Sequence, residues 1–141
     1  MEKICKKCAA DPSSHSFRKV SEKNGVVIYF GHPSTAKLYD DTEGILEHID
    51  KMLALNGNKK WIFIFDGDGF DVKHAMQIKT GMGFIHLLSE KYGDTLLEVK
   101  IINPSWHILG MLKLLSSWID QVLLSKLKIM DDRKYSVLEF I

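Results

Sequence analysis

Two runs of apolar residues dominate the pattern of hydrophobic and polar positions along the chain. Residues 61–70 read WIFIFDGDGF and residues 99–106 read VKIINPSW. Each run is rich in β-branched and aromatic residues and ends in turn chemistry, and a long segment of helical periodicity separates them. Because neither run alternates cleanly with polar residues, both strands are expected to be covered on both faces. The pattern predicts a β-α-β unit in an α/β fold, with a mostly parallel sheet covered by helices.

Two further segments have the pattern of strands. Residues 26–30 read VVIYF and follow an Asn-Gly turn, which predicts a strand that ends before Pro33. Residues 126–130 alternate polar and apolar side chains, which predicts a strand with one face toward solvent. Residues 135–141 are too few to assign to a helix or a strand.

Two segments have apolar residues at the spacing of an amphipathic helix. The first predicted helix covers residues 41–56. The second begins after Asp71, whose side chain can cap it, and ends at Gly93. Gly81 and Gly83 lower the helix propensity of this segment, and close packing of the helix on the sheet explains them better than a break does.

A third helix is predicted over residues 106–124, and its apolar residues lie around nearly the whole circumference. A helix in a domain this small is not easily buried on every side. Part of its surface is therefore expected to line a cavity, meet a partner or touch lipid. Packing against the C-terminal segment or a second copy of the chain is the alternative. The segment is too interrupted by polar residues to cross a bilayer.

The length of 141 residues, with 45% hydrophobic and 26% charged side chains, fits one compact domain and not two. Residues 1–16 contain a proline, several serines and clustered lysines, which predicts a flexible N-terminal arm without core residues. Residues 17–141 are then the single folded domain.

The charge balance and the N-terminus narrow the partners and the location of the protein. A formal net charge of +1 with interspersed lysines and glutamates gives no basic field, so no nucleic-acid partner is expected. The N-terminus is charged and lacks the apolar stretch of a secretory signal. A cytoplasmic location is therefore expected, with peripheral association at membranes as a further possibility.

The order of these motifs resembles the CRAL-TRIO lipid-binding domain over residues 61–130. The matching features are the turn of Asp66, Gly69 and Phe70, a long helix ending in Lys-Tyr-Gly, the sequence Ile-Ile-Asn-Pro-Ser-Trp, an apolar helix, and the strand that starts at Lys126. Each motif is weak alone, and their ordered combination carries the resemblance.

The resemblance implies non-enzymatic binding of a lipid or other small hydrophobic ligand between the sheet and a mobile gate helix, with transfer of that ligand as a further activity. Opening of the gate would expose the same side chains to a membrane surface for a short time. No cofactor is expected. The implied ligand-binding residues form the floor (Phe63, Phe65, Ile101) and the gate (Trp106, Ile108, Leu109, Met111, Leu112, Leu115, Trp118, Ile119). Core packing is the alternative role for each floor residue.

The resemblance also leaves a second function open. The Asn-Pro-Ser-Trp sequence at residues 103–106 is similar to the BCH branch of the family, whose members bind small GTPases and their regulators as well as lipid. The helical domain that usually precedes this fold, and the segment that follows it and helps to close the pocket in the family, are expected to be absent. A BCH-like protein-interaction module without bound lipid is therefore the alternative, with a partner such as a small GTPase regulator.

Asp66 and Asp68 allow a third, less favoured function. Two aspartates after an apolar strand resemble the first motif of haloacid-dehalogenase phosphatases, in which one carboxylate attacks phosphorus, the other moves a proton, and Mg²⁺ is bound between them. Phe70 stands where that motif usually has Thr or Val. A solvated turn is the simpler explanation.

Cys5 and Cys8 have the spacing of a pair of zinc ligands, and His15 could be a third. No second cysteine pair follows them. Two exposed, reduced thiols on a flexible arm are the favoured interpretation, and no metal site is expected.

Overall fold

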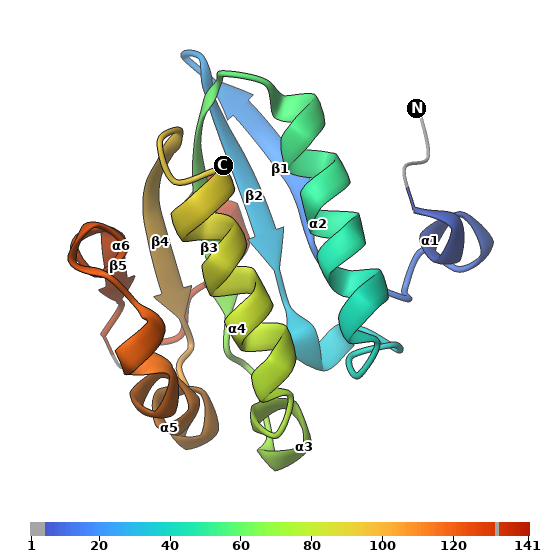
Figure 1. Ribbon diagram of the computed structural model, residues 1–141, viewed down its shortest axis with the longest axis vertical. Coiled ribbons are helices and arrows are strands. Elements are labelled where there is room, and N and C mark those ends of the chain that lie inside the picture. The colour runs from blue at the N-terminus through green and yellow to red at the C-terminus, as the bar shows by residue number, and fades with distance from the viewer. Residues whose placement is uncertain (1–4, 132) are drawn as a thin grey trace.

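Within residues 5–131 and 133–141, which the computed structural model describes, five strands form one sheet in the order of the sequence (Figure 1). The first two strands are antiparallel, and the second to the fifth run parallel to one another. This mixed α/β architecture with a mostly parallel sheet confirms the predicted fold class. The strands are β1 (Arg18–Lys23), β2 (Val26–Gly31), β3 (Lys60–Asp66), β4 (Leu96–Ile102) and β5 (Leu127–Ile129).

The helices that connect the parallel strands lie on one face of the sheet (Figure 1). Each connection steps in the same direction across the sheet, and right-handed crossovers then place every helix on the same side. The helices are α1 (Lys6–Ala10), α2 (Thr42–Asn56), α3 (Val72–Ala75), α4 (Ile78–His86), α5 (Trp106–Leu115) and α6 (Gln121–Lys126). Single helical turns occur at Pro33–Thr35, Leu87–Lys91, Ser116–Trp118 and Val137–Glu139.

The C-terminal segment covers part of the opposite face of the sheet. Tyr135 is buried there against Phe30, Ile64 and Ile102, and Phe140 packs beside them. The strands are thus covered on both faces, as predicted, but helices cover only one of the two.

The sequence pattern does not predict β1, which forms a hairpin with β2. Asn24 and Gly25 connect the two strands with φ values of 54° and 78°. Positive φ at both positions is typical of the two-residue turn that matches the twist of a hairpin.

The predicted second helix is divided in the structure. Asp71 caps α3 as expected, but the chain leaves the helix at Met76 and starts α4 at Ile78. A Cβ atom on Gly81 would lie 2.7 Å from Leu115. On Gly83 it would lie 2.3 Å from Leu46 in α2. The glycines therefore allow helix-to-helix packing, and the prediction of helix-to-sheet packing at these positions is wrong.

The prediction of one continuous helix over residues 106–124 is also wrong. Helix α5 ends at Leu115, the turn Ser116–Trp118 follows, and Ile119 is extended before α6 begins. The side chain of Asp120 accepts a hydrogen bond from the amide of Leu123 at 2.8 Å, so it starts a new helix.

The N-terminal segment differs from the predicted flexible arm without core residues. Residues 1–4 lie outside the described residues. Lys6–Ala10 forms helix α1, and the side chains of Ser14 and His15 are buried. Lys7 and His15 both contact the carboxylate of Asp41, at 2.6 and 3.0 Å. These contacts hold the segment against the start of α2.

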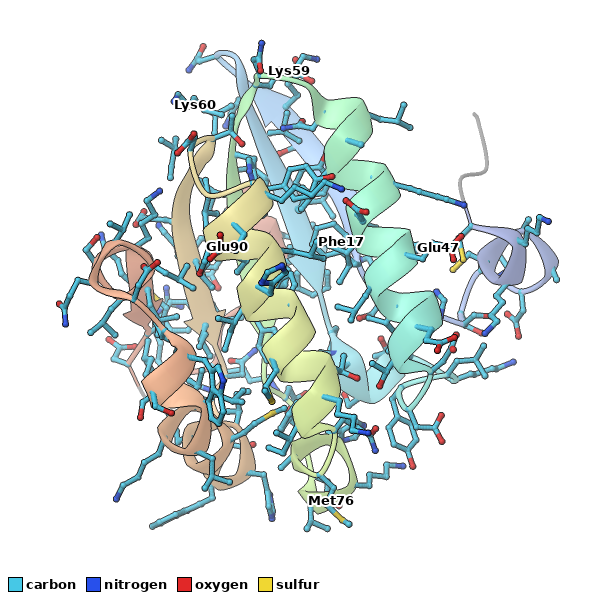
Figure 2. All side chains as sticks on the ribbon, in the orientation of Figure 1. Phe17, Glu47, Lys59, Lys60, Met76 and Glu90 are labelled. Carbon is cyan, nitrogen blue, oxygen red and sulfur yellow. The ribbon has the colours of Figure 1, made fainter. Side chains whose placement is uncertain are left out.

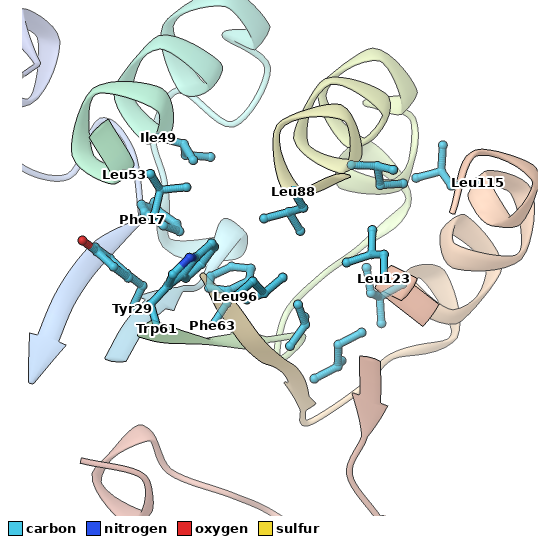
Figure 3. Packing of buried hydrophobic residues seen from close by; sticks show 14 of the residues in the cluster. Phe17, Tyr29, Ile49, Leu53, Trp61, Phe63, Leu88, Leu96, Leu115 and Leu123 are labelled. Atoms are coloured by element: carbon cyan, nitrogen blue, oxygen red, sulfur yellow. The ribbon is translucent and has the colours of Figure 1, made fainter. Parts of the chain in front are cut away.

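The main core lies between the sheet and its helices, and Trp61 of β3 packs in it beside Tyr29 (Figure 3). The Trp61 side chain is fully buried, its ring meets Tyr29 edge to face, and its Nε1 donates to Thr95 Oγ1 at 3.0 Å. The same core includes Phe17, Ile49 and Leu53 at the end of the sheet near α2. It therefore joins the first hairpin to the parallel strands.

Candidate hydrophobic-ligand site

An apolar cavity of about 200 Å³ lies between the sheet and the helices. Its wall combines residues of β3 and β4 with residues of α2, α4 and α5 and of the segment after α5. Engineered apolar cavities of about 150 Å³ bind benzene, so this space has the size to hold part of a hydrophobic molecule.

The floor of the cavity consists of residues that the sequence indicated. Phe63, Phe65 and Ile101 all line it. Residues two apart on a strand point to the same face, and Phe63 and Phe65 accordingly meet edge to face with ring centres 6.0 Å apart. Phe63 and Ile101 are buried and Phe65 is half-buried. The structure brings these three residues together; their contact with a ligand stays a prediction.

The gate residues divide into two groups. Ile108, Met111, Leu112, Leu115 and Ile119 line the cavity. The first four recur at the spacing of one helix face, which places them on the side of α5 that faces the sheet.

Trp106, Leu109 and Trp118 do not line the cavity. Their side chains are 91%, 41% and 53% exposed. Trp106 lies on the side of α5 opposite the lining residues, Leu109 lies at the flank of that helix, and Trp118 follows its end. Contact of these three residues with a ligand inside the cavity is therefore not supported by their positions.

Several lining residues were not indicated as site residues by the sequence. The aromatic rings of Phe17, Phe70 and Phe84 form part of the cavity wall. In the view of Figure 2, Phe17 lies between α2 and α4. Phe84 extends the amphipathic pattern of the second predicted helix, and that pattern could have identified it. Phe17 precedes a strand that the pattern does not reveal, so no signal was available for it.

His74 adds a polar group to the wall. Its ring packs against Tyr39 and Phe70, with centres 5.0 and 5.3 Å away, and its Nδ1 accepts a hydrogen bond from the Asp71 amide at 2.9 Å. Burial lowers the pKa of His74, the charge of Lys73 lowers it further, and Asp71 acts in the opposite direction. The neutral ring is therefore the favoured form beside an apolar cavity.

We expect His74 to make the fold less stable in mild acid. The unfolded chain binds a proton at the ordinary pKa of about 6.5, whereas the folded chain binds it only at lower pH. Between these two pKa values the free energy of unfolding falls as the pH falls, with a limiting slope of about 1.4 kcal/mol per pH unit for each such group. Urea unfolding between pH 7 and pH 5 should show a shallower slope in His74→Asn, which keeps an acceptor for the Asp71 amide. An unchanged slope contradicts the assignment.

The two turns at the carboxyl ends of β3 and β4 are fixed to each other. Asp66 is buried, and its Oδ1 accepts hydrogen bonds from the amide of Asp68 at 2.9 Å and from Asn103 Nδ2 at 3.0 Å. Ser105, the N-cap of α5, donates to the carbonyl of Phe70 at 2.8 Å. The start of α5 is thereby attached to the turn after β3.

These contacts give Asp66 and Asp68 structural partners. Asp66 Oδ1 is engaged by the turn and by Asn103, and the Asp68 carboxylate forms an ion pair with Lys134 at 3.0 Å. The structure thus accounts for both aspartates as parts of a turn. This agrees with the simpler explanation given above and not with a phosphatase motif.

The fold and the cavity together define an α/β domain with an internal apolar site beneath a helix. The sequence model of the CRAL/TRIO domain family matches residues 34–141, and the chain belongs to this family. Its members are known for binding and transferring lipids and are typically non-enzymatic. The interaction-module and phosphatase alternatives are not favoured by this match.

A solved structure has the same fold. The crystal structure of Sfh5 matches with a TM-score of 0.66 and 11% sequence identity, over 91% of this chain and 51% of that chain. The chain thus spans about half the length of this structure, and a likeness at this identity concerns the fold alone. No curated protein matches the sequence.

Proposed function

We propose that this domain binds a lipid or another small hydrophobic molecule in the cavity between the sheet and α5. The apolar cavity above Phe63 and Ile101 is the observation that carries the proposal. Its mostly apolar wall favours binding through removal of apolar surface from water, which contributes about 0.8 kcal/mol per buried methylene. Membership in the CRAL/TRIO family supports the same conclusion.

Helix α5 is proposed to act as the gate. Sites for small molecules usually measure about 300–1,000 Å³, so the cavity of about 200 Å³ has to enlarge before it can enclose a whole lipid. The extended residue Ile119 and the turn Ser116–Trp118 interrupt the helical segment and offer a hinge. At Gly81 of α4, Met111 and Leu115 pack directly against the backbone, with no side chain of α4 in between.

The outer side of the gate is proposed to meet a membrane surface. Trp106, Leu114 and Val122 are 91%, 68% and 65% exposed, and Val72 of α3, which contacts α5, is exposed as well. Met76, the C-cap residue of α3, points away from the molecule just before α4 begins (Figure 2). Among the described residues no helix is long and apolar enough to span a bilayer. Shallow insertion of these side chains is therefore the mode that we propose.

A bulky residue inside the cavity tests the proposal. Leu112 is half-buried and lines the cavity, so Leu112→Trp should fill space that the ligand needs. Titration with a fatty acid that carries an environment-sensitive fluorophore should show at least about tenfold weaker binding, a loss of about 1.4 kcal/mol. Leu114→Trp is the matched control, because it makes the same change on the exposed side of the same helix and should bind the probe as the original chain does.

Two further measurements distinguish the role of the cavity in ligand binding from the role of the outer surface in membrane contact. Trp106→Ser should bind the fatty-acid probe normally but float less with vesicles of neutral phosphatidylcholine. Absence of probe binding by the original chain, or equal binding by Leu112→Trp and Leu114→Trp, contradicts the cavity as the site. Equal flotation of Trp106→Ser and the original chain contradicts the membrane-facing role of that surface.

A further inference from the structure

Two cysteines and two histidines converge at one point beside α2. Cys5 and Cys8 come from the start of α1, His15 from the segment before β1, and His48 from α2, and their ligand atoms all lie within 4.8 Å of one another. Both histidines are buried and both cysteines are half-buried. The prediction of exposed thiols on a flexible arm is therefore wrong.

Three sulfur-to-nitrogen distances in this cluster match those of tetrahedral metal coordination. His15 Nδ1 lies 3.5 Å from Cys5 Sγ and 3.6 Å from Cys8 Sγ, and His48 Nδ1 lies 3.6 Å from Cys8 Sγ. Zinc binds sulfur at about 2.3 Å and imidazole nitrogen at about 2.0–2.1 Å, so tetrahedral angles place a sulfur and a nitrogen about 3.6 Å apart.

When both imidazoles are neutral and carry their hydrogen on Nε2, hydrogen bonds between thiols and imidazoles do not explain all of these contacts. Two thiols carry two hydrogens, whereas three sulfur-to-nitrogen contacts are present. If Cys5 donates to His15 and Cys8 to His48, the contact between Cys8 and His15 has no hydrogen. A cation in the centre satisfies all three contacts at once.

The other nitrogen of each histidine is held by an acceptor. His48 Nε2 lies 2.7 Å from the carbonyl oxygen of Phe17, which can only accept, so Nε2 carries the hydrogen. His15 Nε2 lies 3.0 Å from Asp41 Oδ2. Both rings are thereby oriented with the Nδ1 lone pair toward the sulfurs. Carboxylate and carbonyl partners of this kind orient the histidine ligands of most protein metal sites.

We propose that Cys5, Cys8, His15 and His48 form a structural zinc site. Two thiolates and two imidazoles favour Zn²⁺ over Mg²⁺ or Ca²⁺, which prefer oxygen ligands. The protein supplies all four ligands, which is typical of structural sites and leaves no open position for catalysis. Binding converts both thiols to thiolates and releases two protons to solvent, and the two negative charges balance that of the ion.

The site has a route of entry and a position that matters for the fold. A hollow of about 170 Å³, lined in part by Cys5, His48 and Glu47, opens next to the cluster, and Glu47 lies on the side of α2 near α1 (Figure 2). His15 and His48 also form part of the wall of the apolar cavity. The bound ion would fix α1 to α2 and hold that end of the cavity wall in place.

The test measures the metal content of the chain of 141 residues. The protein is purified under reducing conditions with zinc present, and gel filtration then removes unbound metal. Inductively coupled plasma mass spectrometry should find about one zinc ion per chain. Cys8→Ser and His48→Asn should each lower this at least about tenfold. His86→Asn changes an exposed histidine outside the cluster and should keep the full amount.

Cobalt provides a second readout that does not depend on how well the variants fold. The original chain, stripped of metal and titrated with Co²⁺, should develop the intense visible absorption of tetrahedral coordination with sulfur ligands and lose it when zinc is added. Absence of stoichiometric zinc and of this absorption in the reduced, folded original chain overturns the proposal. Full zinc content in a folded Cys8→Ser variant overturns it as well.

Discussion

Replacing Trp61 with alanine is expected to lower the free energy of unfolding by about 3–5 kcal/mol. The side chain has no exposed surface, packs against Tyr29, and donates a hydrogen bond to Thr95. Alanine removes the largest of the fully buried side chains and leaves the Thr95 hydroxyl without this donor. Because small domains have total stabilities of about 5–15 kcal/mol, the variant should be close to unfolding.

Trp106 supplies the matched control, because its side chain is 91% exposed. Trp106→Ala should change the free energy of unfolding by no more than about 0.5 kcal/mol. Urea unfolding followed by far-ultraviolet circular dichroism measures both variants without relying on tryptophan fluorescence. Similar losses for the two substitutions contradict the burial pattern described above.

The second large effect is expected at Asn103, which joins three parts of the chain. Its Nδ2 donates to Asp66 Oδ1 and to the Tyr135 carbonyl, both at 3.0 Å, and its Oδ1 accepts from the Tyr135 amide at 2.8 Å. Its backbone has a φ of 49°. Asn103→Ala removes three hydrogen bonds, at about 1 kcal/mol each, and places a Cβ without a polar group in the left-handed region, at about 1 kcal/mol more. A loss of about 3–4 kcal/mol follows.

Asn103→Gly separates the two causes. Glycine adopts positive φ without strain, so this variant should recover about 1 kcal/mol relative to Asn103→Ala while it still lacks the hydrogen bonds. The same urea titration measures both. If alanine and glycine give equal stability, the backbone conformation contributes nothing, and if neither differs from the original chain, the hydrogen bonds contribute nothing.

The parts of the fold that the sequence predicts are those with strong apolar patterns. Strands β2, β3 and β4 are buried on both faces and therefore appear as continuous apolar runs. The edge strand β1 was missed because Arg18–Lys23 is polar and largely exposed, so its pairing with β2 leaves little trace in the composition. The division of residues 106–124 was missed because apolar content outweighed one capping residue, Asp120.

The same reasoning explains how far the candidate site could be predicted. The resemblance to the CRAL-TRIO domain implies the floor and gate residues, and helix periodicity accounts for the four gate residues of α5 that share one face. The direction in which that helix faces depends on its packing against α4, through Gly81, and periodicity alone does not define it. The exposed positions of Trp106 and Trp118 are therefore a result of tertiary packing.

The Cys and His cluster depends on tertiary structure even more strongly. Cys5, Cys8 and His15 lie within eleven residues, but His48 follows 33 residues after His15 and comes from a helix whose pattern gives no sign of a metal ligand. Only the position of α2 beside α1 completes the set. A sequence search for two closely spaced ligand pairs would not find it.

The agreement between strand order and chain order bears on how the molecule folds. Every strand after the first pairs with the strand that precedes it along the chain, so each pairing closes a loop of modest length. Topologies with such local pairings fold faster than those that join distant segments. The β1–β2 hairpin can form first, on a timescale of about 1–10 μs, and each later strand then finds its neighbour already in place. The sheet can therefore grow from its N-terminal edge while the chain is still being synthesised.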